Sequence, residues 1–328
     1  MRTALTELLG IEAPIVLAPM GGAGTPELAA AVSNAGGLGT LPLSWSTPDE
    51  IRSQVAEMIA LTDRPYGINL GLQWDQRERL RVALDAGVQV VSLFWGDPAE
   101  LMLAAHAAGA KTMVTVGSAE EAARAVAAGA GVVVAQGWEA GGHVWGTVST
   151  IALVPRVVDV AGPAPVVAAG GIADGRGLAA VLALGAAGAW IGTRFLAATE
   201  AQIHGAYRAR LFEAAETDTF YGSLFDGGWE EAPHRTLRNS TVEAWEAAGR
   251  PPSGSRPGET DELAVVRPDG SPIKRYVSGT PSAGMRGDTE PLSNWAGQSV
   301  GLVTHVQPAG AIVDEIVSDA ERILTELA

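Results

Sequence analysis

The feature that most constrains the fold is an alternation of two textures that repeats eight times along the first part of the chain. One texture is a short apolar run, often β-branched, that ends at Gly, Asn, Gln or Pro and predicts a strand. The expected strands are Pro14–Ala18, Leu38–Leu41, Tyr66–Leu70, Val88–Leu93, Thr112–Val116, Val132–Ala135, Val166–Ala169 and Ala189–Ile191.

The other texture is rich in Ala, Leu, Glu and Arg and has the period of a helix. Several of these stretches begin with a good capping residue, such as Thr47 or Ser118. Most end at a small-residue stop, such as Ala86-Gly87. The expected helices are Thr25–Asn34, Pro48–Leu61, Gln76–Asp85, Pro98–Ala108, Ser118–Ala128, Ile151–Val160 and Gly177–Leu184, with an eighth from about Ala198.

Strands that are apolar on both faces and separated by helices predict a parallel sheet that is covered by helices on both sides. Eight such units favour an α/β fold of the TIM (β/α)8 barrel type, and an open doubly wound sheet is the alternative. We expect the barrel to occupy residues 1–204.

The texture changes after the barrel. Residues 205–291 are rich in Gly, Pro, Arg, Asp and Trp, which indicates turns and a poor core of their own. We therefore expect an extension or lid, inserted before the last helix and packed on the barrel. The helical period returns at Asn294, so residues 292–328 are expected to form a C-terminal helix that packs back on the barrel.

Composition excludes several classes of function. The net charge is −15, from 22 basic and 37 acidic residues without a Lys/Arg run, so nucleic acids and anionic membranes are not expected partners. The absence of cysteine excludes disulfides, thiolate metal sites and a cysteine nucleophile, and no His/Asp/Glu spacing predicts a metal site. Without an apolar run of membrane-spanning length or a signal-peptide pattern, we expect a cytoplasmic protein. The oligomeric state stays open.

Glycine is in excess, with 41 of 328 residues, and some of it falls where barrel enzymes bind phosphate. Gly170 and Gly171 follow the seventh expected strand, and Gly192 and Thr193 follow the eighth. Bare amides next to a helix N-terminus favour a phosphate group. The alternative is a pair of tight turns into helices. Because no lysine is nearby, the pattern favours a backbone-held phosphate monoester such as that of flavin mononucleotide (FMN).

His143 is the histidine that stands in a glycine-rich loop at a strand end. Its ordinary pKa lies near working pH, so it could act as a general base or as a hydrogen-bond donor to substrate. The alternative is a loop histidine that is satisfied by backbone groups. The other histidines are expected to be structural or on the surface.

Tryptophans accompany the expected strand ends. They form either the wall of an apolar substrate pocket or packing at the barrel rim, and both interpretations stay open. The role of Glu139, four residues before His143, also stays open, whereas Asp97 and Asp174 are expected to cap helices. The tryptophans are Trp95, Trp138, Trp145 and Trp295.

Several segments together resemble the nitronate monooxygenase family, formerly called 2-nitropropane dioxygenases. They are "APIVLAPMGG", "GGLGTL", "GIN", "AQGWEAGGH", "VVAAGGIADGRGLAAVLALGAAGAWIGTRF", "FDGGWEEAPHRTLRN" and "WAGQSVGL". The resemblance extends over nearly the whole chain. It implies a TIM-barrel oxidoreductase with non-covalent FMN, which oxidises alkyl nitronates with O2 to a carbonyl compound and nitrite.

The resemblance also implies roles for individual residues. His143 matches the family's active-site histidine, as base or hydrogen-bond donor to substrate. The phosphate would lie at Gly171, Gly192 and Thr193, with Gly142 nearby. The residues implied to line the flavin ring are Met20, Asn69 and Gln136, with Gln298 close.

Three positions depart from the family pattern. Phe94 stands where many nitronate enzymes have a second histidine, in the run Ser92–Gly96. Trp295 stands where many have tyrosine, and Thr115 where some flavin relatives have lysine. The FMN site is therefore better supported than the substrate. The alternative is an NAD(P)H-dependent FMN reductase on the same scaffold, of the type II enoyl-ACP reductase or quinone reductase kind. A third reading is a flavin- or phosphate-binding protein without catalysis. The expected partners are a small-molecule substrate with O2 or NAD(P)H.

Overall fold

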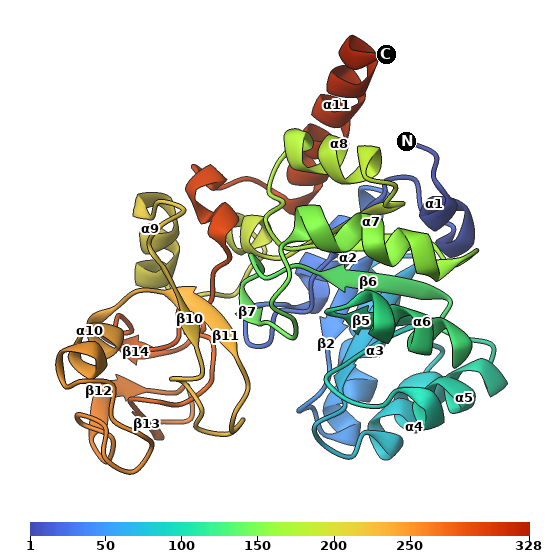
Figure 1. Ribbon diagram of the computed structural model, residues 1–328. Coiled ribbons are helices and arrows are strands. Elements are labelled where there is room, and N and C mark those ends of the chain that lie inside the picture. Colours follow the sequence, from blue (N-terminus) through green and yellow to red (C-terminus); the bar gives the residue numbers. More distant parts are fainter.

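The computed structural model describes residues 1–328, apart from the side chain of Glu262. Its centre is a sheet of eight parallel strands in the order β1-β9-β8-β6-β5-β4-β3-β2 (Figure 1). A bridge between Val16 and Leu38 joins the first and last strands of this order and closes the barrel. The strands are β1 (Ile15–Leu17), β2 (Gly39–Pro42), β3 (Tyr66–Gly71), β4 (Val90–Phe94), β5 (Lys111–Val116), β6 (Val132–Gln136), β8 (Val166–Ala169) and β9 (Gly188–Ile191).

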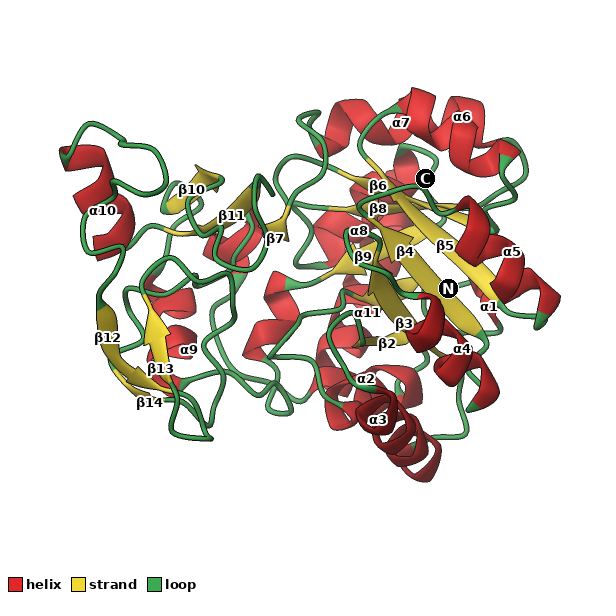
Figure 2. Ribbon diagram, turned by 90° about the horizontal axis from the view of Figure 1, so that it is seen from below, coloured by secondary structure: helices red, strands yellow, loops and turns green.

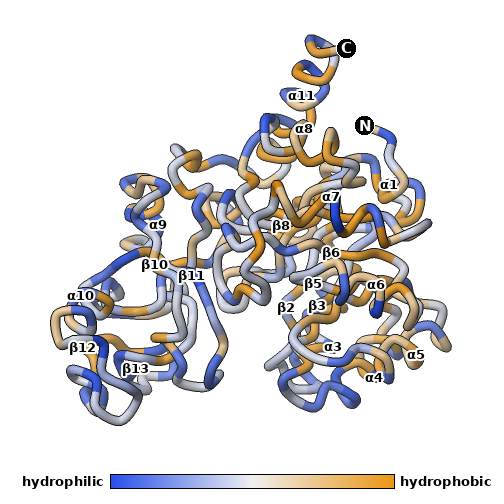
Figure 3. Tube along the Cα trace, viewed as in Figure 1, coloured by the Kyte–Doolittle hydropathy of each residue, from blue (hydrophilic) through white to orange (hydrophobic). Residues whose placement is uncertain are grey.

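The expectation of a TIM barrel is confirmed, because all eight expected strands form and every pair is parallel. The register places Gln136 of β6 opposite Ala169 of β8, so the residues that follow these strands emerge at the same end of the barrel. Figure 3 shows β6 as a strongly apolar stretch, as expected for a strand covered on both faces.

The barrel helices surround the sheet (Figure 2). Each follows a strand, and the predicted caps form: Thr47 and Ser118 each accept a hydrogen bond from a backbone N–H in the first helical turn. A short helix α1 (Ala4–Leu9) precedes the first strand, and Leu5 and Leu9 pack against the side chains inside the barrel. The others are α2 (Pro26–Asn34), α3 (Pro48–Leu61), α4 (Arg77–Asp85), α5 (Ala99–Ala107), α6 (Ala119–Ala127), α7 (Thr150–Ala161) and α8 (Gly175–Ala183).

The prediction of an eighth helix from about Ala198 is wrong. A short 3-10 helix, η1 (Thr193–Ala197), follows β9, and Ala198 is extended. Ala198 pairs instead with Gln307 from the far end of the chain, so a tertiary contact overrides the local helix propensity of this alanine-rich segment.

The eighth barrel helix is the C-terminal helix α11 (Ala309–Leu327), which packs between α8 and α2. The sequence predicted that helical structure returns at Asn294, and this start is wrong. Residues 294–308 contain the 3-10 helix η2 (Gln298–Leu302), and α11 starts directly after Pro308. Proline has no N–H to donate and disfavours the helical conformation in the residue before it, so it sets this start.

Residues 205–291 lie beside the barrel (left in Figure 1) and are called the insert below. One of its two three-stranded sheets includes a strand of the barrel side, because β11 pairs with both β10 and β7 (Gly142–His143). The insert has small apolar clusters of its own around Phe225 and Val265. Its elements are α9 (Gly205–Glu213), β10 (Thr219–Gly222), β11 (His234–Leu237), α10 (Ser240–Ala247), β12 (Glu262–Val266), β13 (Pro272–Lys274) and β14 (Arg286–Gly287).

Across the described residues, no helix combines the length and apolar character needed to cross a membrane.

Candidate active site

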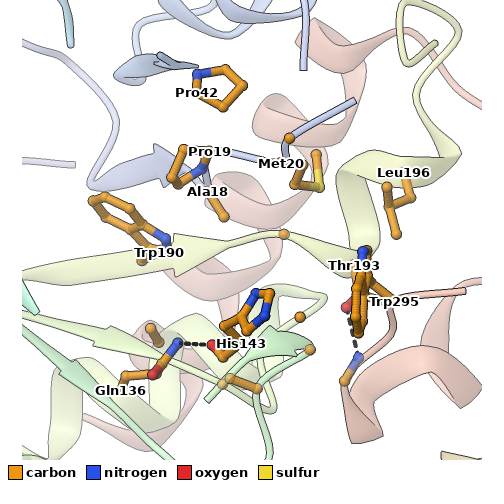
Figure 4. Close-up of a pocket in the computed structure, with 18 of the residues that line it drawn as sticks. Ala18, Pro19, Met20, Pro42, Gln136, His143, Trp190, Thr193, Leu196 and Trp295 are labelled. Atoms are coloured by element: carbon orange, nitrogen blue, oxygen red, sulfur yellow. Dashed lines mark hydrogen bonds between the residues drawn. The ribbon is translucent and has the colours of Figure 1, made fainter. Parts of the chain in front are cut away.

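A cavity of about 440 Å³ lies at the carboxyl ends of the barrel strands, and residues of the insert complete its wall. Most residues singled out from the sequence line it, although they come from the ends of five barrel strands, from β7 and from the C-terminal segment (Figure 4). These residues are Met20, Asn69, Gln136, Gly142, His143, Gly170, Gly171, Gly192, Thr193 and Trp295.

Four other predicted residues lie near the cavity but do not line it. Gln298 uses its backbone N–H to bind the Glu139 carbonyl oxygen, 2.9 Å away. Trp138 carries the Arg235 guanidinium over its ring, at 4.4 Å from the ring centre.

The remaining two are Trp95 and Trp145, whose rings contact each other edge to face. The Trp145 indole N–H donates to the Glu121 carboxylate at the barrel rim. These three tryptophans therefore pack around the cavity, and of the four predicted ones Trp295 alone reaches it.

Part of the cavity wall, called the cradle below, is formed by the backbone of Gly170, Gly171, Gly192 and Thr193. A Cβ at Gly170 would lie 2.9 Å from the Gly137 carbonyl oxygen, and φ is +101° there, so this position requires glycine. Gly171 also has a positive φ, of +75°.

Within the described part of the chain, the backbone N–H groups of Gly171, Gly192 and Thr193 have no hydrogen-bond acceptor. The Thr193 hydroxyl oxygen accepts from Gly297 N, 3.0 Å away, which ties the cradle to the C-terminal segment (Figure 4). Such bare amides suit a phosphate group.

Gln136 positions the segment that carries His143. Its side-chain nitrogen donates to the His143 carbonyl oxygen at 3.0 Å, and its side-chain oxygen accepts from Trp145 N at 2.8 Å. The pairing of β7 with β11 holds the same segment from the other side, with His143 opposite His234. A loop histidine is thereby held between the barrel and the insert.

His143 is neutral at physiological pH. Burial, and to a smaller extent repulsion from His234, lowers the pKa of its imidazole to about 3. Its Nε2 atom is buried and has no hydrogen-bond partner among the described residues. The alternative of a loop histidine satisfied by the backbone therefore finds no support at this nitrogen. An unpaired ring nitrogen in a cavity can share a proton with a bound molecule.

Glu139, whose role was open, and His234, which was expected to be structural or on the surface, both have hydrogen-bond partners within the protein. The Glu139 carboxylate accepts from the backbone N–H of Thr150 at 2.9 Å and from its hydroxyl, and so caps helix α7. His234 is fully buried; its Nε2 accepts from Phe225 N, and burial lowers its pKa to about 4. Asp174 caps α8, as predicted.

Sequence reasoning missed three tryptophans that line the cavity, Trp45, Trp190 and Trp229. Trp229, from the loop between β10 and β11, stacks on His143 with ring centres 3.9 Å apart. Trp229 stands in the segment "FDGGWEEAPHRTLRN", which belongs to the family resemblance. The segment has no periodicity that would predict the position of the ring. The described residues contain no cluster that could hold a metal ion.

A sequence profile of the family described as nitronate monooxygenase matches residues 2–78 and 70–319. The chain belongs to this family. The resemblance stated from the motifs is thus confirmed, and the protein is an oxidoreductase of the nitronate monooxygenase type.

Named relatives of this family member differ in their activities. One from Mycobacterium tuberculosis, named (3aS,4S,5R,7aS)-5-hydroxy-7a-methyl-1-oxo-octahydro-1H-indene-4-carboxyl-CoA dehydrogenase, is 40% identical and covers 76% of this chain and 70% of its own. The nitronate monooxygenase of Pseudomonas aeruginosa is 33% identical and covers 97% and 99%. Among solved structures, FabK from Thermotoga maritima has a TM-score of 0.85 with 34% identity, covering 100% and 98%.

Proposed function

We propose that this enzyme binds FMN and uses it to oxidise small alkyl nitronates with O2 to a carbonyl compound and nitrite. The observation that carries the proposal is the position of His143: a neutral imidazole with an unpaired nitrogen lies in the same cavity as a cradle of bare amides. The family membership supports the same reaction.

The cavity fits FMN by chemistry and by size. The amides of Gly171, Gly192 and Thr193 would hold the phosphate, because they line the cavity and lack acceptors. A volume of about 440 Å³ lies in the range of cofactor pockets. Met20 and Asn69 would line the flavin ring, and the Asn69 side chain is held by Ser92 Oγ at 3.1 Å. When bound, FMN supplies the electron transfer to O2.

His143 would act on the substrate. A nitronate carries a negative charge, and an anion close to an imidazole raises its pKa. A bound nitronate would thus raise the pKa of His143 from its value of about 3 in the free site and favour a hydrogen bond from the imidazole N–H to the anion. With a neutral nitroalkane, the same unpaired nitrogen would accept the α-proton.

Anaerobic spectra of the flavin test this proposal. Propyl-2-nitronate is expected to change the visible flavin spectrum, and O2 is expected to restore it with release of acetone and nitrite. A protein that is purified without flavin and takes up no added FMN contradicts the proposal. So does a flavin that NADPH reduces and nitronate does not.

The second candidate is a dehydrogenase or NAD(P)H-dependent reductase on the same site. Two observations favour it. The relative from M. tuberculosis is named as a dehydrogenase and is 40% identical, against 33% for the P. aeruginosa monooxygenase, and Phe94 stands where many nitronate enzymes have a second histidine. Under this candidate, an alicyclic carboxyl-CoA ester or NADPH reduces the flavin anaerobically, and nitronate leaves it oxidised.

A further inference from the structure

Trp229 is an almost fully enclosed side chain with an unsatisfied donor. It is 3% exposed, although it stands in a loop of the insert, and it lines the cavity. Its indole nitrogen Nε1 has no hydrogen-bond partner among the described residues. Buried indole N–H groups usually find an acceptor. A missing acceptor beside a ligand cavity indicates that a ligand supplies it.

Trp229 also lies next to His143, whose ring carries a second unsatisfied nitrogen. The Trp229 ring stacks on the His143 imidazole with 3.9 Å between ring centres and 29° between planes. Nε2 of His143 is also buried and unpaired. Two stacked side chains that both line the cavity therefore each carry an unsatisfied nitrogen.

The surroundings of Trp229 are aromatic. The rings of Trp45, Trp74, Phe94 and Trp95 meet it edge to face, with centre distances of 4.7–6.1 Å. Because Trp229 itself is almost fully buried, a hydrogen bond from its indole to an anion is shielded from water and is stronger than in water.

The backbone conformation of Gly227 and Gly228 positions the Trp229 indole in the cavity wall. Gly227 is fastened to the neighbouring segment by two hydrogen bonds of 2.9 Å, one to Tyr276 O and one from Ser278 N. Gly228 follows with a φ of +101°, which turns the chain so that Trp229 enters the cavity. The insert thus contributes Trp229 to the cavity wall, in addition to Tyr207, Ser278 and Thr280.

We propose that Trp229 contacts the substrate and donates its indole N–H to an oxygen of an anionic head group held at His143. The substrate class that fits is a small carbon acid with two oxygens on one atom, a nitronate or a carboxylate of the same shape, with an apolar body against the aromatic rings. The inference rests on the proposed function for the identity of the reacting substrate. The anion contact itself is independent of turnover.

The test uses the FMN-loaded protein and 2-methylpropanoate, a carboxylate with the heavy-atom skeleton of propyl-2-nitronate. Its dissociation constant is measured by calorimetry for the wild type, Trp229→Phe and Trp245→Phe. Loss of a hydrogen bond to a charged group is expected to weaken binding by about 10- to 100-fold in Trp229→Phe. Trp245→Phe makes the same change in a tryptophan of α10 that does not line the cavity, and is expected to bind as the wild type does.

Equal affinity of Trp229→Phe and the wild type overturns the inference, and so does a wild type that does not bind the carboxylate. If Trp229→Phe fails to fold, proton NMR of the wild-type protein still tests the inference. A hydrogen bond from the Trp229 indole to the carboxylate is expected to move one of the nine indole N–H resonances downfield on saturation with 2-methylpropanoate. Nine unmoved resonances overturn the inference. Carboxylate binding that depends on Trp229, without turnover of nitronate, supports the inference and contradicts the proposed function.

Discussion

The side-chain nitrogen of Gln136 donates a hydrogen bond to the backbone oxygen of His143, 3.0 Å away. The side-chain oxygen of Gln136 binds the N–H of Trp145, so the carboxamide spans the segment on both sides of Val144. The end of a rigid barrel strand therefore sets where the imidazole stands. A site built in this way has little freedom to rearrange.

We predict that Gln136→Met, which keeps the length of the side chain and removes both hydrogen bonds, lowers kcat for the proposed substrate by about tenfold or more through misplacement of His143. The loss of two hydrogen bonds, one partly buried and one exposed, is expected to lower the free energy of unfolding by about 1–2 kcal/mol. Steady-state kinetics and urea unfolding check the two effects. Unchanged kinetics together with reduced stability would show that the clamp is structural alone.

We predict that His143→Ala loses turnover by about 10² to 10⁴, the range for removal of a general acid or base, and retains FMN. FMN is expected to be retained because the phosphate would be held by backbone amides at other strand ends, which this substitution does not change. Flavin content by absorbance and initial rates measure the two quantities. Loss of FMN in place of activity would make His143 a structural residue.

We predict that Gly170→Ala impairs FMN binding by more than tenfold. The new Cβ would meet the Gly137 carbonyl oxygen at 2.9 Å and Ala140 N at 3.0 Å, and a φ of +101° costs about 1–2 kcal/mol for alanine. Gly205→Ala is the matched control, because a Cβ there meets nothing within 4 Å. Titration of the apoprotein with FMN gives both affinities, and equal values would place the phosphate elsewhere.

Acid is expected to destabilise the fold through two buried histidines. Burial lowers the pKa of His143 to about 3 and that of His234 to about 4, from an ordinary value of 6.5. The unfolded chain therefore binds more protons than the folded chain between pH 6.5 and these lower values. The stability that the neutral imidazoles provide is complete above pH 6.5 and is lost as the pH falls toward 3.

Each histidine contributes a slope of up to ~1.4 kcal/mol per pH unit in this window. We predict that His234→Asn has a smaller slope of unfolding free energy against pH than the wild type between about pH 4 and 6, measured by urea unfolding. Above pH 7 the two slopes are expected to agree. Parallel curves over the whole range would show that His234 is not held neutral.

Much of the fold follows from local patterns. Strands such as Val132–Gln136 are apolar on both faces and helices such as Pro48–Leu61 begin with a cap, so both can be predicted from residues that are neighbours in the chain. The barrel then follows, because eight parallel strands covered on both sides have few other arrangements.

Other features depend on contacts that no local pattern contains. The alanine-rich segment at Ala198 has the composition of a helix, yet it is extended because it pairs with Gln307. The eighth barrel helix comes from the chain terminus for the same reason: α8 and α2 leave an apolar face that α11 covers.

In the candidate site, too, some residues can be predicted from local sequence patterns and others depend on tertiary contacts. His143 and the glycines of the cradle could be predicted from the sequence, because strand ends of a parallel barrel meet at one face and backbone amides need no side chain. Trp229 could not, because an aperiodic loop in the insert reaches the imidazole only after β11 pairs with β7. The sequence by itself determined the barrel and which residues of the candidate site stand at its strand ends. Tertiary structure alone decided which distant side chain encloses these residues, since through-space packing between remote segments leaves no periodic signal in either one.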